Sequence, residues 1–407
     1  MHCSVKLLNK IRVPRKPLIS AGLRKLPPAA LCLSLSLLVA ASEVWSSAAP
    51  VPGDPDPSAP ARFLGQPSCS SSSCHGGAGD KRGQCLSFDK LDFHSIRPYA
   101  TLTTRRSAVL AESLQIKDPT TSARCTVCHA PFQNVPAERR SPAIDPTRGL
   151  SCETCHGPAE NWLRSHTRGD FSHQDRIQAG MRDLQNPYVR ANTCVACHQN
   201  VDGDLLRAGH PELIFELDGQ AVTQPKHWHE PAGWSGAKAW AVGQAAALRE
   251  MSWQLSREKT PPESLPQRWA GLAWVLQHAG LAAGPATAGL EPSADNFATV
   301  QKWADALATN TAAAEWKTEH TLASLKALAS ASTAFRAKDT PQPLQARRAE
   351  RLALAVDRLV IGLGDKAIAD RAEPVITRLF QSTQSLPGFD SDKFAGQLEE
   401  LQKALGN

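Results

Sequence analysis

Three short segments combine two cysteines and a histidine at one fixed spacing, Cys-x-x-Cys-His. Two thiols at this spacing can each form a thioether bond to one porphyrin, and the histidine that follows can bind the iron from the same side. One such pentapeptide is expected by chance about once in a hundred chains of this composition, so three predict covalently bound haem c. The residues are Cys125, Cys128 and His129; Cys152, Cys155 and His156; and Cys194, Cys197 and His198.

A fourth segment has a longer spacing, with four serines between Cys69 and Cys74 and with His75 directly afterwards. The longer loop can still bring both sulfurs to the edge of one macrocycle, so we predict a fourth haem c here. The rival interpretation is a disulfide beside an ordinary histidine. Cys85 remains outside the motifs and is interpreted as a spare thiol or a packing residue.

Zinc is the other chemistry that Cys-x-x-Cys pairs support. Two such pairs could build a four-cysteine zinc site, but that site does not require a histidine directly after every second cysteine. The repeated histidines therefore favour haem. Nucleic-acid binding is disfavoured, because the excess of basic residues lies within residues 1–48 and the rest of the chain has equal numbers of acidic and basic side chains.

Each haem iron has a second axial position, which histidine or methionine usually fills. The chain has only three methionines, including Met1, but 13 histidines. Coordination by two histidines is therefore favoured, with low reduction potentials. Apart from His2, the histidines outside the motifs are His94, His166, His173, His210, His227, His229, His278 and His320. For His173, His229 and His320, an ordinary surface or hydrogen-bonded role is the stronger interpretation.

Two stretches resemble exported multihaem cytochromes of the cytochrome c-554 type. Residues 149–166 are similar to their GVSCExCHGPA…W…H stretch, and residues 208–228 to AGHPxLxFE…PxHW. Asp92-Phe-His94 with Tyr99 resembles the DxH…Y segment after their first haem. The resemblance covers roughly residues 63–230 and implies a tetrahaem electron-transfer domain. It also implies that neighbouring segments supply the distal ligands, here His94, His166, His210 and His227, although one haem in such proteins can lack a distal ligand.

Longer related sequences carry a further haem motif in a stretch that resembles PELAxFDCxxCHHDL. The comparable place here is Gln267–His278, where Trp274 and Gln277 stand at the positions of the cysteines. We therefore expect that a fifth haem has been lost, with His278 left as a relic or as a distal ligand.

The N-terminus has the pattern of an export signal. Seven basic residues within 1–48 precede the short apolar stretch 29–41, and small residues follow at 46–49. This predicts a signal peptide at 1–48 and a periplasmic or otherwise exported protein, with contact to a membrane only if the segment stays uncleaved. The proline-rich stretch 49–62 is predicted to be an extended linker.

The rest of the chain divides by composition into a tetrahaem domain at 63–233 and an α-helical domain at 234–407, so the predicted class is mainly α. The first part should have little regular structure, with short helices after each motif and porphyrins in its core. The second part has no cysteine and shows apolar residues at helical spacing, which predicts a helical bundle. The clearest faces are at 240–255, at 352–363 with stops at Gly362 and Gly364, and at 394–405 with Asp390 as cap.

The leading functional hypothesis is an exported cytochrome that transfers electrons through four covalent haems. Its expected partners are other cytochromes or a membrane quinol enzyme. The alternative is a multihaem oxidoreductase that acts on a small nitrogen or sulfur compound at one five-coordinate haem. Tyr99 and Tyr188 are the two tyrosines that a crosslinked haem could use. A third class is a docking subunit whose helical half binds a redox partner.

Overall fold

The computed structural model describes residues 61–77, 84–219, 224–281 and 294–406, and the predicted signal peptide and nearly all of the linker lie outside them. Within these ranges the structure is helical, and extended backbone pairs only at an isolated bridge between Phe63 and Arg140. The predicted mainly α class is confirmed. None of the described helices has both the length and the apolar character that crossing a bilayer requires.

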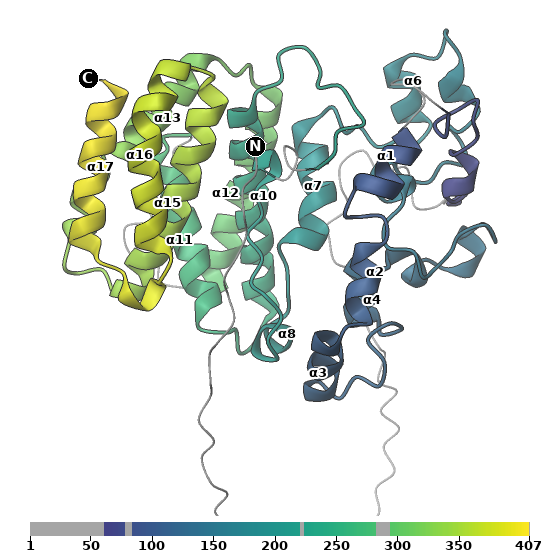
Figure 1. Cartoon of the computed structure of the whole chain (residues 1–407), viewed down its shortest axis with the longest axis horizontal. Coiled ribbons are helices and arrows are strands. Elements are labelled where there is room, and N and C mark those ends of the chain that lie inside the picture. Colours follow the sequence, from purple (N-terminus) through teal and green to yellow (C-terminus); the bar gives the residue numbers. More distant parts are fainter. Residues whose placement is uncertain (1–60, 78–83, 220–223, 282–293, 407) are drawn as a thin grey trace, which may run out of the picture. The chain divides into compact units, whose positions relative to one another are not determined.

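The cysteine-bearing region, which is the part of the predicted tetrahaem domain at 63–233 that the structure describes, is built from short helices joined by turns (Figure 1). Its helices are α1 (Gln84–Leu91), α2 (Arg97–Leu102), α3 (Arg105–Ser113), α4 (Ala123–His129), α5 (Cys152–His156), α6 (His173–Gln178), α7 (Pro187–His198) and α8 (Gly203–Arg207). Single 3-10 turns lie at Gln66–Ser68, Pro131–Asn134, Ala137–Arg139 and Ser165–Thr167. This is the sparse regular structure expected of a region with little apolar periodicity.

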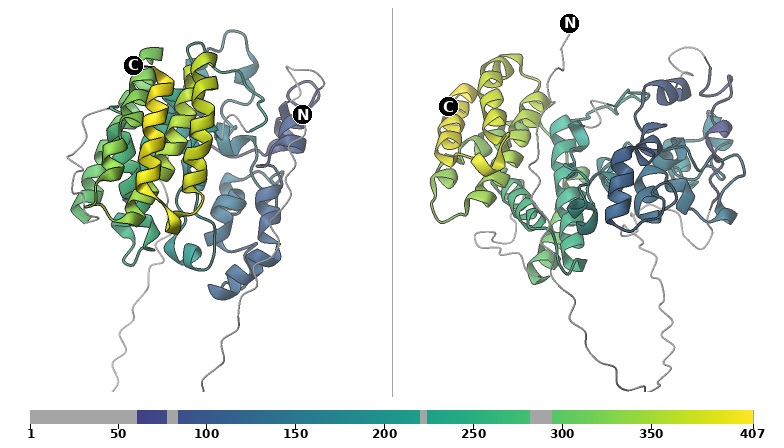
Figure 2. Two further views of the ribbon diagram at one scale, coloured as in Figure 1. Left: turned by 60° about the vertical axis from the view of Figure 1, so that its left-hand side comes forward. Right: turned by 60° about the horizontal axis from the view of Figure 1, so that its bottom comes forward.

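The C-terminal region consists of longer helices, with α15, α16 and α17 side by side in Figures 1 and 2. They are α10 (Gly236–Arg257), α11 (Ser264–His278), α12 (Ala294–Ala313), α13 (Thr318–Ala329), α14 (Ser332–Arg336), α15 (Gln342–Leu363), α16 (Lys366–Thr383) and α17 (Ser391–Leu405), with a 3-10 turn at Leu386–Gly388. The three apolar faces read from the sequence lie on α10, α15 and α17. The predicted C-terminal helical region is thereby confirmed.

Helix ends follow local chemistry. The Asp390 side chain accepts the backbone N–H of Lys393 at 3.0 Å and caps α17, as the sequence predicts. Gly364 ends α15 in the left-handed conformation with φ 70°. Gly362, expected as a second stop, instead lies within α15, where an added Cβ would be 2.8 Å from the Ala237 nitrogen. Gly362 therefore serves the close approach of α15 to the start of α10.

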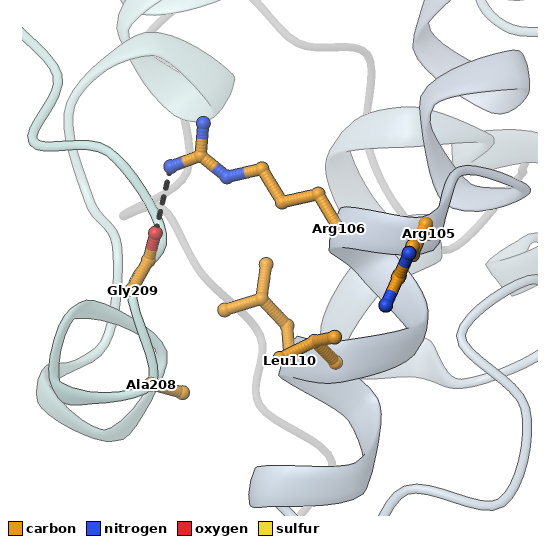
Figure 3. A pocket seen from close by; sticks show the side chains of 6 residues that line it. Arg105, Arg106, Leu110, Ala208 and Gly209 are labelled. Atoms are coloured by element: carbon orange, nitrogen blue, oxygen red, sulfur yellow. Dashed lines mark hydrogen bonds between the residues drawn. The ribbon is translucent and has the colours of Figure 1, made fainter. Parts of the chain in front are cut away.

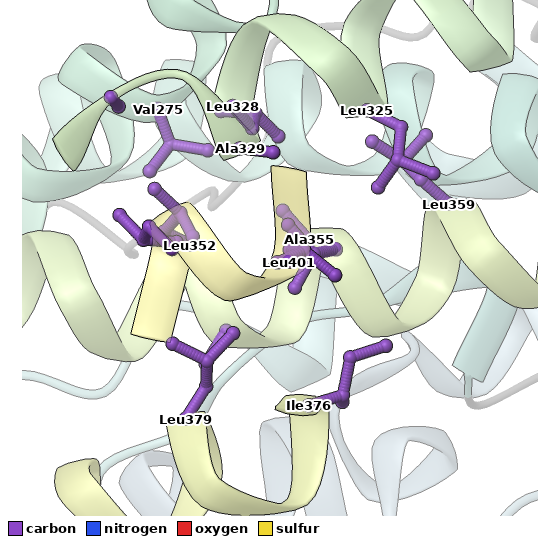
Figure 4. Packing of buried hydrophobic residues seen from close by; sticks show 14 of the residues in the cluster. Val275, Leu325, Leu328, Ala329, Leu352, Ala355, Leu359, Ile376, Leu379 and Leu401 are labelled. Carbon is purple, nitrogen blue, oxygen red and sulfur yellow. The ribbon is translucent and has the colours of Figure 1, made fainter. Parts of the chain in front are cut away.

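Two apolar clusters hold the C-terminal region together. In the first, Leu352, Val356 and Leu359 of α15 pack among residues of α13, α16 and α17 (Figure 4). The second joins α10, α11 and α12 around Trp269, Leu248 and Met251. Burial of this apolar surface is the main stabilising contribution to the helical region.

The second cluster also contains residues from the cysteine-bearing region. Tyr188, Ala191 and Val195 of α7 are members, and so are Phe215 and Leu217. The domain boundary at 233/234 stays a prediction, and the apolar core continues across it. Helix α7, which ends in a Cys-x-x-Cys-His motif, is therefore anchored on the helical region.

Candidate metal centres

Three motifs lie at the C-terminal ends of helices. Helices α4, α5 and α7 end at His129, His156 and His198. We expected helices after each motif, whereas the motifs themselves are helical. The reason is geometric, because cysteines three positions apart share one face of a helix, where one ligand can reach both.

The first motif is a turn instead of a helix. The backbone N–H of Cys74 donates to the Ser71 carbonyl at 3.0 Å, and that of His75 donates to the Cys69 carbonyl at 3.1 Å. An added Cβ at Gly76 would lie 1.9 Å from the Ser70 carbonyl oxygen, so this turn requires glycine there. The two extra residues are thus absorbed within a closed turn, and His75 keeps its place directly after the second cysteine.

Three motif histidines face a second histidine from a distant part of the chain, and the fourth, His129, has His210 nearby. The ring centroids of His75 and His166 are 6.2 Å apart with planes inclined by 13°. Those of His198 and His94 are 5.8 Å apart at 70°, and those of His156 and His227 are 6.4 Å apart at 69°. For His129, burial lowers the pKa, the bond to the Pro98 carbonyl opposes this, and His210 lowers the pKa further, so His210 lies near His129.

These separations suit a shared metal ion. Two imidazole nitrogens that each lie about 2 Å from one metal place the ring centroids roughly 6 Å apart. Among the described residues, no group of three or more His, Cys, Asp or Glu side chains forms a metal site. Two protein ligands per metal match a porphyrin, whose four ring nitrogens leave two axial positions. The pairs therefore fit haem, which two histidines and two cysteines at each place would hold.

The hydrogen bonds of the rings leave the opposite nitrogen for the metal. In four of the eight histidines, Nδ1–H donates to a carbonyl or carboxylate oxygen, which fixes the tautomer and leaves the Nε2 lone pair available. The acceptors are the Pro98 carbonyl for His129 at 2.8 Å, the Leu163 carbonyl for His166 at 2.7 Å, the Pro211 carbonyl for His210 at 2.9 Å and the Asp92 carboxylate for His94 at 2.7 Å.

Burial keeps two of the motif histidines neutral. It lowers the pKa of His156 to about 4, and the neighbouring His227 lowers it further. It also lowers the pKa of His198 to about 4, with a smaller contribution from His94. Neutral imidazole is the form that binds a metal, so both rings are ready to bind at neutral pH.

Asp92 links the segment of His94 to the segment that leads to His227. Burial raises the pKa of this carboxyl, but hydrogen bonds from His94 and Gln224 outweigh that effect and lower the pKa overall. The ionised carboxylate accepts from the His94 ring and backbone and from the Gln224 amide. Asp92 thus orients His94 and holds the segment that leads to His227.

The attachment sites are neighbours in the order first, third, fourth, second. His156 of the third motif interacts electrostatically with His75 of the first. Cys197 of the fourth motif interacts with Cys155 of the third and forms a thiol hydrogen bond with Cys128 of the second. Burial raises the pKa of the Cys155 and Cys194 thiols to about 11 and about 12, so both stay protonated at neutral pH.

Glu153 was not singled out in the sequence, although it is an acid placed between the cysteines of the third motif. Its buried carboxylate accepts the backbone N–H groups of Gly65 at 2.6 Å, Ala159 at 2.8 Å and Leu64 at 2.9 Å. Burial raises its pKa despite these bonds. Glu153 therefore fastens the chain before the first motif onto the third motif, which sets the spacing of their histidines.

The helical region clamps the segment that follows His210. Residues 212–216 receive bonds from three helices, which no local signal in the sequence indicates. From α10, Gln244 donates to the Phe215 carbonyl at 2.8 Å; from α11, the buried Arg268 donates to the Leu213 carbonyl; and from α15, Arg347 and Arg358 pair with Glu212 at 3.0 Å and Glu216 at 3.2 Å. The helical region thus positions the segment that directly follows His210.

Three of the four remaining histidines have other partners. His173 pairs with Asp183 at 3.1 Å, His229 is exposed, and His320 accepts the Lys317 backbone N–H at 3.2 Å. His278 stacks on Trp274 at 3.8 Å and bonds to its carbonyl. These contacts account for His173, His278 and His320 without a metal, and the lost fifth haem stays a prediction.

The two tyrosines considered for a crosslink lie in different surroundings. The Tyr188 hydroxyl donates to Asp305 of α12 at 2.8 Å, and Arg249 of α10 donates to the same carboxylate at 2.9 Å. Tyr188 is thus engaged in docking α7 on the helical region, while Tyr99 is half-buried within α2. The side chain of Cys85 lies outside the described residues.

Comparison with known proteins adds one finding. Residues 68–157 match the profile of the family described as cytochrome c554 and c-prime. The match spans the first three motifs and His94, and it ends before the fourth motif. No curated protein and no solved structure matches the chain.

The matched range contains three of the motifs, those that end at His75, His129 and His156. Residues 68–157 belong to the cytochrome c554 and c-prime family, and the chain is a protein that carries haem c and transfers electrons.

Proposed function

We propose that this protein is an exported tetrahaem cytochrome that transfers electrons among four haem c groups. Bound haem supplies one-electron chemistry, and the protein supplies attachment, axial ligands and a fixed spacing. The observation that carries the proposal is the contact of three motif histidines with His166, His94 and His227, supported by the nearness of His210 to His129.

The proposed roles of the residues follow from this pairing. Thioether attachment is assigned to Cys69 and Cys74, Cys125 and Cys128, Cys152 and Cys155, and Cys194 and Cys197. The axial pairs are His75 with His166, His129 with His210, His156 with His227 and His198 with His94. The attachment sites are neighbours in the order first, third, fourth, second. This order supports haems that lie close to one another along the series, as electron exchange requires.

Export and partners follow from the N-terminal sequence and from the proposed chemistry. The basic and apolar stretches within 1–48 support export to the compartment where haem c is attached. A protein with closed iron sites exchanges electrons with other redox proteins, for which other cytochromes and a membrane quinol enzyme are the candidates. The alternative oxidoreductase activity needs an open iron position, and the four pairs favour closed ones.

Haem counting tests the proposal. The alkaline pyridine spectrum and the intact mass of protein made with haem-attachment machinery should give four haems per chain. The C69S/C74S variant should give three, and C194S/C197S provides a matched control that should also give three. Four haems in C69S/C74S would contradict attachment at the first turn, and five in the wild type would contradict the loss of a fifth motif.

A further inference from the structure

A cavity of about 380 Å³ lies between α3 and the turn that leads to His210. Figure 3 shows Arg105, Arg106 and Leu110 of α3 on one side and Ala208 and Gly209 on the other. Gly209 directly precedes His210 and has φ 103°, a conformation that favours glycine. The cavity is therefore adjacent to a proposed distal ligand.

Two positive charges without an acidic partner line this cavity. Neither Arg105 nor Arg106 forms an ion pair within the part of the chain that the structure describes. Arg106 reaches across the cavity and donates one N–H to the Gly209 carbonyl at 2.8 Å, as Figure 3 shows. A guanidinium has five N–H donors, so both side chains retain donors for an anionic ligand.

The remaining walls are apolar. Val109 of α3 is 52% exposed and lines the cavity. Leu110 extends toward Gly209, and one of its methyl carbons would lie 3.9 Å from a Cβ added there. The cavity thus offers an apolar surface beside two cationic groups, which suits a ligand with an apolar body and carboxylate ends.

We propose that this cavity binds carboxylate groups through Arg105 and Arg106, with Val109 and Leu110 packed against the apolar part of the ligand. The inference rests on the proposed function, because a haem held between His129 and His210 would carry two propionates, and His210 directly follows Gly209 of this cavity. A free carboxylate has the same head-group chemistry, so the test must separate the two sources.

Redox titration of the four-haem protein tests the proposal. In R105Q/R106Q, one midpoint potential should fall while the others stay unchanged, because loss of nearby cations favours the more positive ferric state. We expect about a tenfold change in the equilibrium of that haem, which corresponds to 59 mV for one electron. R105K/R106K should retain the wild-type potential. R371Q/R378Q, which removes two cations from α16, controls for net charge.

The single variant R105Q is the control for impaired haem attachment in the double variant. No hydrogen bond or ion pair of the described residues is lost with the Arg105 side chain, so R105Q should attach haem normally. It should give a smaller shift of the same potential. Wild-type potentials in fully loaded R105Q/R106Q would overturn the proposal. A wild-type protein without haem would instead contradict the proposed function and remove the propionate source.

Exchange of chloride for acetate at constant ionic strength separates the sources. A propionate held by the arginines gives potentials and a melting temperature that do not depend on acetate. A free anion at this place gives wild-type values that shift with acetate and R105Q/R106Q values that do not. The melting temperature needs no haem, so this second reading is available for every variant.

Discussion

The cysteine-bearing region and the helical region reach stability in different ways. The helical region buries two apolar clusters, and Ile361 is its only large hydrophobic side chain that is strongly exposed among the described residues. The cysteine-bearing region exposes Leu91, Phe93 and Ile96 by 50% or more and contributes few residues to either cluster. The comparison indicates that the first region depends on its cofactors for a core, whereas the second has its own.

The largest expected effect comes from removing all cofactors. Replacement of the eight motif cysteines with serine should leave α7 and the helices within 236–405 protected in hydrogen exchange, while residues 63–185 exchange rapidly. The physical reason is that porphyrins would supply the apolar surface that the cysteine-bearing region lacks. Equal protection of both regions in the haem-free variant would contradict the comparison.

Truncation of a buried side chain in the helical core should destabilise the protein without changing the haem spectrum. Phe394 is fully buried, with its ring centroid 4.8 Å from that of Phe335. Phe394→Ala should lower the free energy of unfolding by about 3–5 kcal/mol, because it removes a large buried side chain. Denaturant titration measures this loss, and an altered spin state in the folded variant would show that the two regions are coupled more tightly than described.

Loss of a hydrogen bond that holds the segment after His210 should have the opposite result: the haem spectrum should change, with little loss of stability. Arg268→Met removes the bond to the Leu213 carbonyl while keeping an apolar stem, so one of four haems should become partly high-spin. Electron paramagnetic resonance measures this fraction, and added imidazole should restore the low-spin signal. If Arg268→Met stays fully low-spin, the helical region does not position this ligand.

The last expected effect is a pH dependence at the junction of the two regions. Burial raises the pKa of Asp218 to about 7, with a further contribution from Glu216 that Arg358 opposes only in part. A raised carboxyl pKa stabilises the folded state below the ordinary pKa of 3.8, and this contribution is lost as the pH rises toward 7.

Asp218→Asn removes that titration. Wild-type stability relative to D218N should therefore fall between about pH 4 and pH 7 and level off above it. Thermal melts over this range measure the difference. A constant difference between the two proteins would show that Asp218 titrates normally.

The regions also differ in how much of them could be predicted. Apolar spacing predicted α10, α15 and α17, and Asp390 was recognised as a cap, because these features depend on neighbours within a few residues. Gly362 was misread as a stop, because its role depends on the approach of Ala237 from another helix. Local sequence patterns predict the helices, whereas tertiary contacts decide exceptions such as Gly362.

In the cysteine-bearing region the motifs predicted the cysteines and histidines that would hold haem. These assignments stay a prediction until haem is measured. The pairing of distal with motif histidines could not be read, because His75 and His166 meet only after the intervening chain has folded. Glu153 and Arg268 were missed for the same reason, since their acceptors and donors are backbone groups of remote segments. A charged residue between two motif cysteines was the one available signal.

The central claim is that four irons each lie between two histidines. Near-infrared magnetic circular dichroism of the oxidised, loaded protein identifies the axial ligands and, with the haem count, their number. The account predicts four low-spin haems per chain, all with histidine–histidine coordination. A high-spin haem, a methionine-ligated haem or fewer than four charge-transfer equivalents would contradict it.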